Sequence, residues 1–240
     1  MGLLDEAVEV PRKTMTMFFL IDTSGSMGGT SIGQVNDAMR EVLPDLKDIS
    51  DENADAKIKL AVMTFSSGVQ WITPSPVELD SFKWTNLEAA GPTDLGEACK
   101  ELNSKLDRNA FLQDAVGVYA PVIILISDGE PTDDFKAGLA TLKENKFYKA
   151  AIKVALGVED ADMDLLAEFT GNKELAIYLK DKTMLKKLIR FVSVTSSKVG
   201  SKKGGDASQD AAEARQEEVA EAIHEELEEI TSETSVDEGW

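Results

Sequence analysis

One stretch near the start of the chain indicates the fold: MTMFFLIDTSGSM, which spans residues 15–27. Residues 15–21 are apolar except for Thr16, and such a continuous run is typical of a strand buried on both faces of a parallel sheet. The run stops at Asp22, and small polar residues follow it. We therefore expect a central strand whose carboxyl end carries a polar loop.

Outward from this strand, apolar runs alternate with segments of helical periodicity. The most apolar run is Pro121–Ile126, PVIILI, which we expect to be a second central strand. Strands that alternate with helices predict an α/β fold, a doubly wound and mostly parallel sheet of six strands with helices on both faces. The other expected strands are 57–65, 69–73, 150–158 and 175–179, and the expected helices are 32–49, 94–106, 133–145, 160–170 and 181–194.

Local signals refine three of these elements. Pro44 lies inside the first helical period, so we expect a kink or an early end there. The turn Ser66-Ser67-Gly68 predicts a hairpin between the strands on either side of it. Thr132 is a plausible N-cap for the helix expected over 133–145, with Asp133 and Asp134 in the first turn.

Composition divides the chain into three parts: a polar arm over 1–13, a globular domain over 14–198, and a flexible linker with an acidic tail over 199–240. Residues 201–240 hold 13 acidic and 3 basic residues, more than half of the net charge of −19. A narrow apolar stripe within the tail, Val219, Ile223, Leu227 and Ile230, predicts at most a short helix, marginal without a partner surface. We expect the segment to be dispensable for the fold, because its charge density does not favour a core.

Charge and cysteine content limit the functional classes. A net charge of −19 opposes binding to nucleic acid or to an anionic membrane surface. No apolar run approaches the roughly 18 residues that a membrane span needs, and the start of the chain lacks the pattern of a secretory signal. The single cysteine, Cys99, fits a reducing compartment, so we expect a cytoplasmic protein.

Three polar motifs follow predicted strands or open predicted helices. The first is Asp22-x-Ser24-x-Ser26 after the first strand. The second is Thr93, in Gly91-Pro92-Thr93-Asp94, before the helix expected at 94–106. The third is Asp128, directly after the apolar run that ends at Ile126.

Together the motifs resemble the metal-ion-dependent adhesion site (MIDAS) of the von Willebrand factor A (VWA) family, over about Thr14 to Thr195. The resemblance implies one divalent metal ion held by Asp22, Ser24, Ser26, Thr93 and Asp128. It further implies a binding module, not an enzyme, that captures a carboxylate of a protein partner through the ion. The phrase SDGEPTDD, residues 127–134, is most similar to the bacterial tellurite-resistance-associated (TerY-like) branch, which implies a stress-response setting with kinase or phosphatase partners.

The chemistry of the residues agrees with the resemblance. Oxygen ligands from Asp, Ser and Thr suit Mg²⁺, with Mn²⁺ as a substitute. In doubly wound sheets, ligands bind beyond the carboxyl ends of strands where the strand order reverses. Asp22 and Asp128 both end strands that, as the resemblance implies, lie side by side at that point. Pro92 departs from the family, which usually has Gly there, and it stiffens the Thr93 loop.

Other interpretations of the same residues stay open. Ser24, Gly25 and Ser26 alone indicate only a turn with a helix cap. A metal-dependent phosphatase is the best enzyme alternative, although phosphatases of the haloacid dehalogenase type have Asp where this chain has Ser24. A metal-free scaffold is the third alternative. A Ser-His-Asp hydrolase is disfavoured because the only histidine, His224, lies in the tail.

Overall fold

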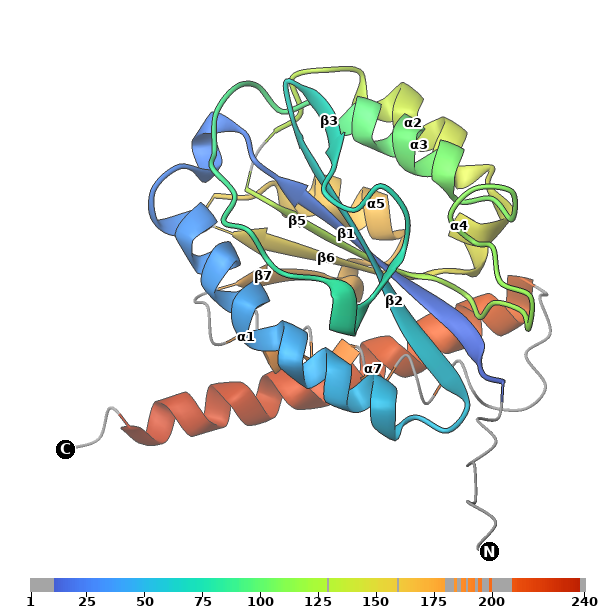
Figure 1. Ribbon diagram of the computed structural model, residues 1–240. Helices are drawn as coiled ribbons and strands as arrows, with labels where there is room; N and C mark the ends of the chain where they lie inside the picture. The colour runs from blue at the N-terminus through green and yellow to red at the C-terminus, as the bar shows by residue number, and fades with distance from the viewer. Residues whose placement is uncertain are drawn as a thin grey trace, which may run out of the picture.

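The computed structural model describes residues 11–128, 130–158, 160–179 and 209–237, with a few positions between 184 and 199; the side chains of 209–210 and 230–237 are not described. A central sheet lies between two layers of helices (Figure 1). The strands are β1 (Lys13–Asp22), β2 (Ala56–Ser66), β3 (Gly68–Trp71), β4 (Val77–Glu78), β5 (Val122–Ser127), β6 (Ile152–Val158) and β7 (Ala176–Leu179). The helices are α1 (Thr30–Glu52), α2 (Leu95–Lys105), α3 (Phe135–Lys143), α4 (Lys146–Ala150), α5 (Met163–Thr170) and α7 (Gln209–Asp237), with the 3-10 turns η1 (Gly25–Met27), η2 (Leu79–Ser81) and η3 (Lys173–Leu175).

The strand order confirms the expected doubly wound α/β fold. The order is β3-β2-β1-β5-β6-β7, and β1, β2, β5, β6 and β7 pair in parallel. β3 forms the expected antiparallel hairpin with β2. The two-residue β4 was not expected; it pairs with β2 and makes a seventh strand. The chain winds from β1 toward β2 on one side and returns to β5 on the other, so the order reverses between β1 and β5.

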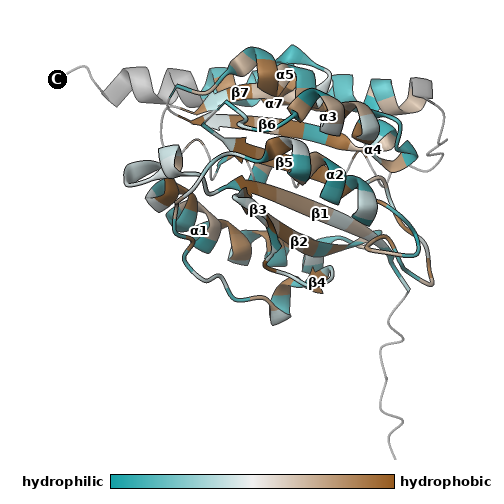
Figure 2. Ribbon diagram, turned by 90° about the horizontal axis from the view of Figure 1, so that it is seen from above, coloured by the Kyte–Doolittle hydropathy of each residue, from teal (hydrophilic) through white to brown (hydrophobic). Residues whose placement is uncertain are grey.

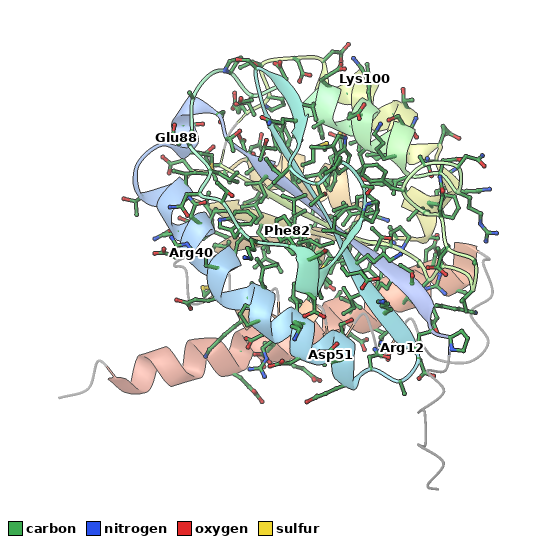
Figure 3. The ribbon with its side chains drawn as sticks, in the orientation of Figure 1. Arg12, Arg40, Asp51, Phe82, Glu88 and Lys100 are labelled. Atoms are coloured by element: carbon green, nitrogen blue, oxygen red, sulfur yellow. The ribbon has the colours of Figure 1, made fainter. Side chains whose placement is uncertain are left out.

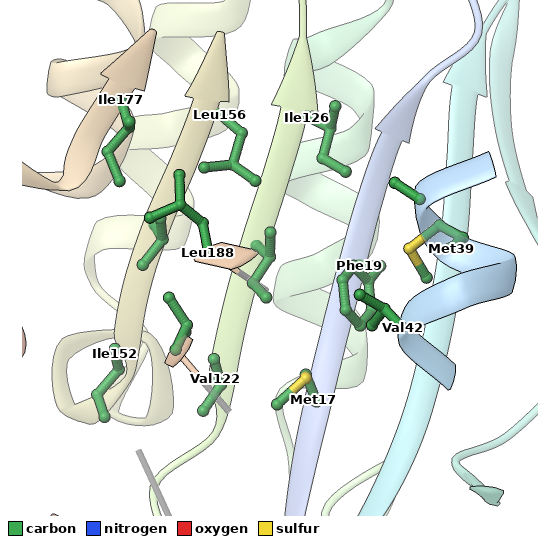
Figure 4. Close-up of a cluster of buried hydrophobic side chains, with 14 of the residues drawn as sticks. Met17, Phe19, Met39, Val42, Val122, Ile126, Ile152, Leu156, Ile177 and Leu188 are labelled. Atoms are coloured by element: carbon green, nitrogen blue, oxygen red, sulfur yellow. The ribbon is translucent and has the colours of Figure 1, made fainter. Parts of the chain in front are cut away.

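The sheet has two apolar faces, which Figure 2 shows as hydrophobic strands between amphipathic helices. One face packs against α1 and α7, and Figure 4 shows Met39 and Val42 of α1 against Phe19 of β1. The other face packs against α2, α3, α4 and α5. Alternate residues of each central strand supply the two faces, which explains why these strands are apolar without a break.

Helix α1 corrects one expectation. It contains Pro44 and continues to Glu52, so an early end at the proline is wrong. Val42 and Leu46, on either side of the proline, are fully buried against the sheet. Burial of such side chains contributes about 1.5–3 kcal/mol each, comparable to the roughly 3 kcal/mol cost of an internal proline.

Helix α7 corrects the expectation of a short helix in the acidic tail. It spans 29 residues, and Val219, Ala220 and Ile223 are buried in the same core as α1. The partner surface that the stripe requires is the chain's own, because α7 contacts β6, α4 and η3. The expectation that this segment lacks core residues is therefore wrong for 211–229. The linker expected from residue 199 is wrong at Val199, which is helical and buried in the core, and its remainder, 200–208, lies outside the described residues.

The helix expected over 181–194 is only partly described. Met184, Leu188 and Val192 are helical and buried in the core beside α7. Of the helices that the structure describes, none is long and apolar enough to cross a membrane.

Candidate functional site

The site lies where the strand order reverses, at the carboxyl ends of β1 and β5. Asp22 is the last residue of β1, and Asp128 directly follows β5. The two strands pair in parallel with Ile21 opposite Ile126, which brings both carboxylates to one edge of the sheet. Ser127 links them further, since its hydroxyl donates a 2.6 Å hydrogen bond to Oδ2 of Asp22.

A continuous chain of polar groups joins four of the five predicted residues. Oδ1 of Asp22 accepts a hydrogen bond of 2.8 Å from the backbone N–H of Ser24. The hydroxyl oxygens of Ser24 and Ser26 are 2.9 Å apart. The hydroxyl of Ser26 donates to Oδ1 of Asp128 at 2.9 Å. Met27, next in the chain, is fully buried and anchors this loop to the core.

Thr93 is brought to the same place by the backbone around it. The N–H of Ala90 donates to the carbonyl of Thr23 at 2.8 Å, and the N–H of Gly25 donates to the carbonyl of Gly91 at 2.9 Å. Gly91 has φ of 90°, and a Cβ there would lie 2.6 Å from the Ser67 hydroxyl, so this position requires glycine. The side chain of Thr93 is 4 % exposed, and the site hydrogen bonds described above do not involve its hydroxyl.

The loop after Asp128 is locked to the Thr93 loop by two reciprocal hydrogen bonds. The N–H of Thr93 donates to the Thr132 hydroxyl at 3.0 Å, and the N–H of Thr132 donates to the Thr93 carbonyl at 2.8 Å. The carboxylate of Asp133 then accepts from the N–H groups of Gly96 and Glu97, at 2.8 and 2.7 Å. We call these contacts of Thr132 and Asp133 the clasp.

The clasp corrects two expectations. Thr132 is not the N-cap of α3; Asp134 is, and its side chain accepts from the N–H of Ala137. Asp133, expected in the first turn of the helix over 133–145, instead lies before α3 and caps the first turn of α2, where a carboxylate is stabilised by unpaired N–H groups. No local pattern predicts this, because its hydrogen-bond partners lie 36 and 37 residues away. One sequence feature is consistent with the close approach of these two segments: position 96 is glycine, and a Cβ there would lie 2.5 Å from the Asp134 carbonyl.

The electrostatics of the site favour a cation. Asp22 has no exposed surface. Burial raises the pKa of the Asp22 carboxyl above its usual value, and hydrogen bonds from Ser127 and Ser24 offset only part of that rise. Among the described residues, no basic side chain acts to lower the pKa of Asp22. A buried carboxylate without a cationic partner is costly, and a bound metal ion is one way to compensate for it.

The donor set is made of oxygen alone. The described residues contain no group of three or more His, Cys, Asp or Glu side chains placed to hold a metal. The site instead combines two carboxylates with serine and threonine hydroxyls, and Ser26 is exposed to solvent while Asp22 and Ser24 are buried. Such a set fits a hard divalent ion reached from outside.

Comparison with protein-family models gives one match. The von Willebrand factor type A domain matches residues 17–191, most of the chain. The chain belongs to the von Willebrand factor type A family. The match includes every residue of the predicted site and ends before α7.

Solved VWA structures share the fold at low sequence identity. A von Willebrand factor type A protein from Catenulispora acidiphila has a TM-score of 0.55 and 16% identity over 77% of this chain and 43% of its own. The ArnB paralog VWA2 from Sulfolobus acidocaldarius has a TM-score of 0.54 and 15% identity, covering 75% and 45%. Proximal thread matrix protein 1 from the mussel byssus, with a zinc-occupied MIDAS motif, has a TM-score of 0.53 and 18% identity, covering 78% and 46%. The chain thus spans less than half the length of these proteins, and no curated protein sequence matches it.

Membership of the family indicates the general kind of function. VWA domains are typically interaction modules rather than enzymes, and the family binds a divalent metal at its MIDAS motif, which is occupied by zinc in the mussel protein. The assignment of individual metal ligands in this chain goes beyond that statement.

Cys99 and His224, singled out from the sequence, and Trp71 lie away from the site. Cys99 is a buried core residue of α2, and burial raises the pKa of its thiol well above the usual value. His224 is exposed on α7, 3.2 Å from Glu228. Trp71 packs against Phe111 and donates to Glu101.

Proposed function

We propose that this chain is a metal-dependent protein-interaction module that binds an acidic residue of a partner. The observation that carries the proposal is the hydrogen-bonded chain from Ser24 through Ser26 to Asp128 beside the buried carboxylate of Asp22. Two carboxylates and two hydroxyls therefore lie close together at one edge of the sheet.

Asp22, Ser24, Ser26, Thr93 and Asp128 would hold the ion, which we propose to be Mg²⁺, with Mn²⁺ as a substitute. When bound, the ion supplies a positive centre that accepts an external carboxylate. Two carboxylates balance the charge of a divalent ion, and the neutral hydroxyls add ligands without adding negative charge. The site therefore keeps its attraction for an acidic group, which a third aspartate would reduce.

We infer binding rather than catalysis. Both oxygens of Asp22 already accept hydrogen bonds, from Ser24 and Ser127, which leaves this carboxylate poorly placed as a nucleophile. The chain's histidine, His224, is exposed on α7, a helix that packs against β6, α4 and η3. These contacts argue against the phosphatase and hydrolase alternatives. The metal-free scaffold is disfavoured by the cost of leaving Asp22 buried without a cation.

The setting we propose is a bacterial stress response of the tellurite-resistance type, in the cytoplasm, with a kinase or phosphatase of the same system as partner. The support is the phrase SDGEPTDD over 127–134 and the lone, buried Cys99. The clasp is built from Thr132 and Asp133 of that phrase, so the phrase has a structural purpose at the site.

The test is capture of partners by the full chain in Mg²⁺ and in chelator, with Asp22→Asn as the matched variant. We expect a partner that is retained only by the wild type in Mg²⁺. Replacing one surface Asp or Glu of that partner by its amide should abolish retention. Retention that persists in chelator, or that survives every such replacement in the partner, would refute carboxylate capture through a metal.

A further inference from the structure

A polar cleft of about 700 Å³ adjoins the site on the α1 side of the sheet. One wall is the β2–β3 hairpin, including Thr64, Ser66 and Gln70. The other wall is the segment over 86–90, whose path is fixed by Asn36 of α1. The Asn36 side chain donates to the Leu87 carbonyl at 2.9 Å and accepts from the Leu87 N–H at 2.8 Å.

The cleft is continuous with the loops that carry the proposed metal ligands. Thr23, which lines it, lies between Asp22 and Ser24 in the chain. Ala90, which lines it on the other wall, is hydrogen-bonded to Thr23 and precedes the loop that leads to Thr93. A partner segment whose carboxylate reaches the ion would therefore pass over or into the cleft with its neighbouring residues.

Two threonine hydroxyls of the lining already donate their hydrogens inside the protein. The Thr23 hydroxyl donates its hydrogen to the Phe65 carbonyl at 3.2 Å. The Thr64 hydroxyl donates to the Gln70 carbonyl at 3.4 Å. Each hydroxyl has only one hydrogen, so these two oxygens retain lone pairs and no free donor. These two positions can therefore accept a hydrogen bond from a donating group of a partner. Four other side chains of the lining can donate as well as accept: Ser66, Ser67, Gln70 and Asn86.

The charge of the cleft favours a cationic group of the partner. Of the described residues that line it, only Glu88 is charged, and its side chain is exposed (Figure 3). The whole chain carries −19, so a purely acidic partner segment would be repelled everywhere except at the ion. A basic side chain beside the partner's carboxylate would meet Glu88 and reduce that repulsion.

We propose that this cleft binds a lysine or arginine of the partner, about two to four residues from the carboxylate that the metal captures. The spacing follows from an extended segment, which advances about 3.3 Å per residue. The inference rests on the proposed metal-dependent function. It adds a selection rule: the partner segment carries one acidic and one basic residue, not a run of acids.

The test uses short glycine–serine peptides with one aspartate and one arginine two, three or four residues away on either side. Each has a counterpart with glutamine in place of arginine. Binding to the full chain in Mg²⁺ and in chelator is followed by NMR chemical-shift titration. For the best spacing, we expect the arginine peptide to bind about threefold to fivefold more tightly than its counterpart, as an exposed ion pair supplies.

Two variants locate the effect. Glu88→Gln should bring the ratio between the arginine and glutamine peptides close to one, while both peptides still bind in Mg²⁺. Glu52→Gln, an exposed acid at the far end of α1, should leave the ratio unchanged. Mg²⁺-dependent binding with equal affinities for the two peptides, or a ratio that survives Glu88→Gln, would overturn the cleft assignment alone. Absence of Mg²⁺-dependent binding by every peptide would count against the metal-dependent function itself.

Discussion

The two faces of the sheet are built by different means. The helices on the face under α1 and α7 dock mainly through apolar stripes such as Val219 and Ile223, although α1 also has buried polar residues there, Asn36 and Ser50. The face under α2 to α5 also has an apolar core, but polar groups lock its helices together: Asp133 caps α2, and Lys153 is buried beside α4. The site lies at the edge of both faces. The comparison indicates that burial holds the outer helices in place, while hydrogen bonds set the register of the loops that carry the proposed metal ligands.

The largest effect is expected on the apolar face. Ile223→Ala should lower the free energy of unfolding by about 3 kcal/mol, because it removes a fully buried side chain and leaves a cavity. Urea denaturation measures the loss. The matched control is His224→Ala, the exposed neighbour, with an expected change within about 0.5 kcal/mol. Equal stabilities of the two variants would show that α7 does not dock through its stripe.

The next effect concerns Lys153 on the polar face. Its ammonium donates to the carbonyls of Tyr148 and Ala151, at 3.2 and 3.4 Å, and burial lowers the pKa of Lys153 from 10.5 to about 8. Between these values the unfolded chain binds the proton and the folded chain does not, so stability rises with pH. We expect a gain of roughly 2 kcal/mol from pH 7 to 9.5 that Lys153→Met lacks, measured by denaturation at each pH. The exposed Lys173→Met should keep the gain; a slope shared by all three proteins would contradict the assignment.

The smallest effect concerns the clasp. Thr132→Val removes the acceptor of the Thr93 N–H with little change in volume, so it should cost about 1 kcal/mol of stability. It should also weaken Mg²⁺ binding, because the Thr93 loop is no longer locked to the Asp128 loop. Calorimetric titration measures the affinity. Thr141→Val on the exposed face of α3, where the hydroxyl bonds only within its own helix, should leave it unchanged.

The sequence predicts the apolar face well, because strand and helix periods are local properties. The runs around Phe19 and Ile124 indicate two central strands, and the motif at Asp22 places the site at a strand end. Docking of α7 is less predictable, since the stripe around Val219 is narrow and its partner surface is formed by β6, far away in the chain. The clasp is predictable least of all. Nothing near Asp133 shows that its hydrogen-bond partners are the first residues of α2.

The hydrogen bonds of the buried Lys153 are hard to predict for the same reason. Lys153 is 5 % exposed, and its position within an apolar strand gives no sign that nearby carbonyls accept its hydrogen bonds. Such long-range hydrogen bonds form only when the fold has packed, so no local sequence pattern predicts them. Motif matching makes Thr93 a candidate ligand without them, but it does not show which contacts hold the Thr93 loop in place.

Metal binding at the edge of the sheet is best tested by a Mg²⁺ titration of the full chain, followed by calorimetry and by thermal unfolding. We predict one saturable site per chain, and a gain in stability of about 2.7 kcal/mol at a hundredfold excess over Kd. Mn²⁺ should act in the same way. Asp22→Asn, which keeps the shape of the side chain, should remain folded and lose the gain, and Ser26→Ala at the exposed end of the site should weaken it. No binding by the wild type, or equal binding by Asp22→Asn, would contradict a metal site built on these residues.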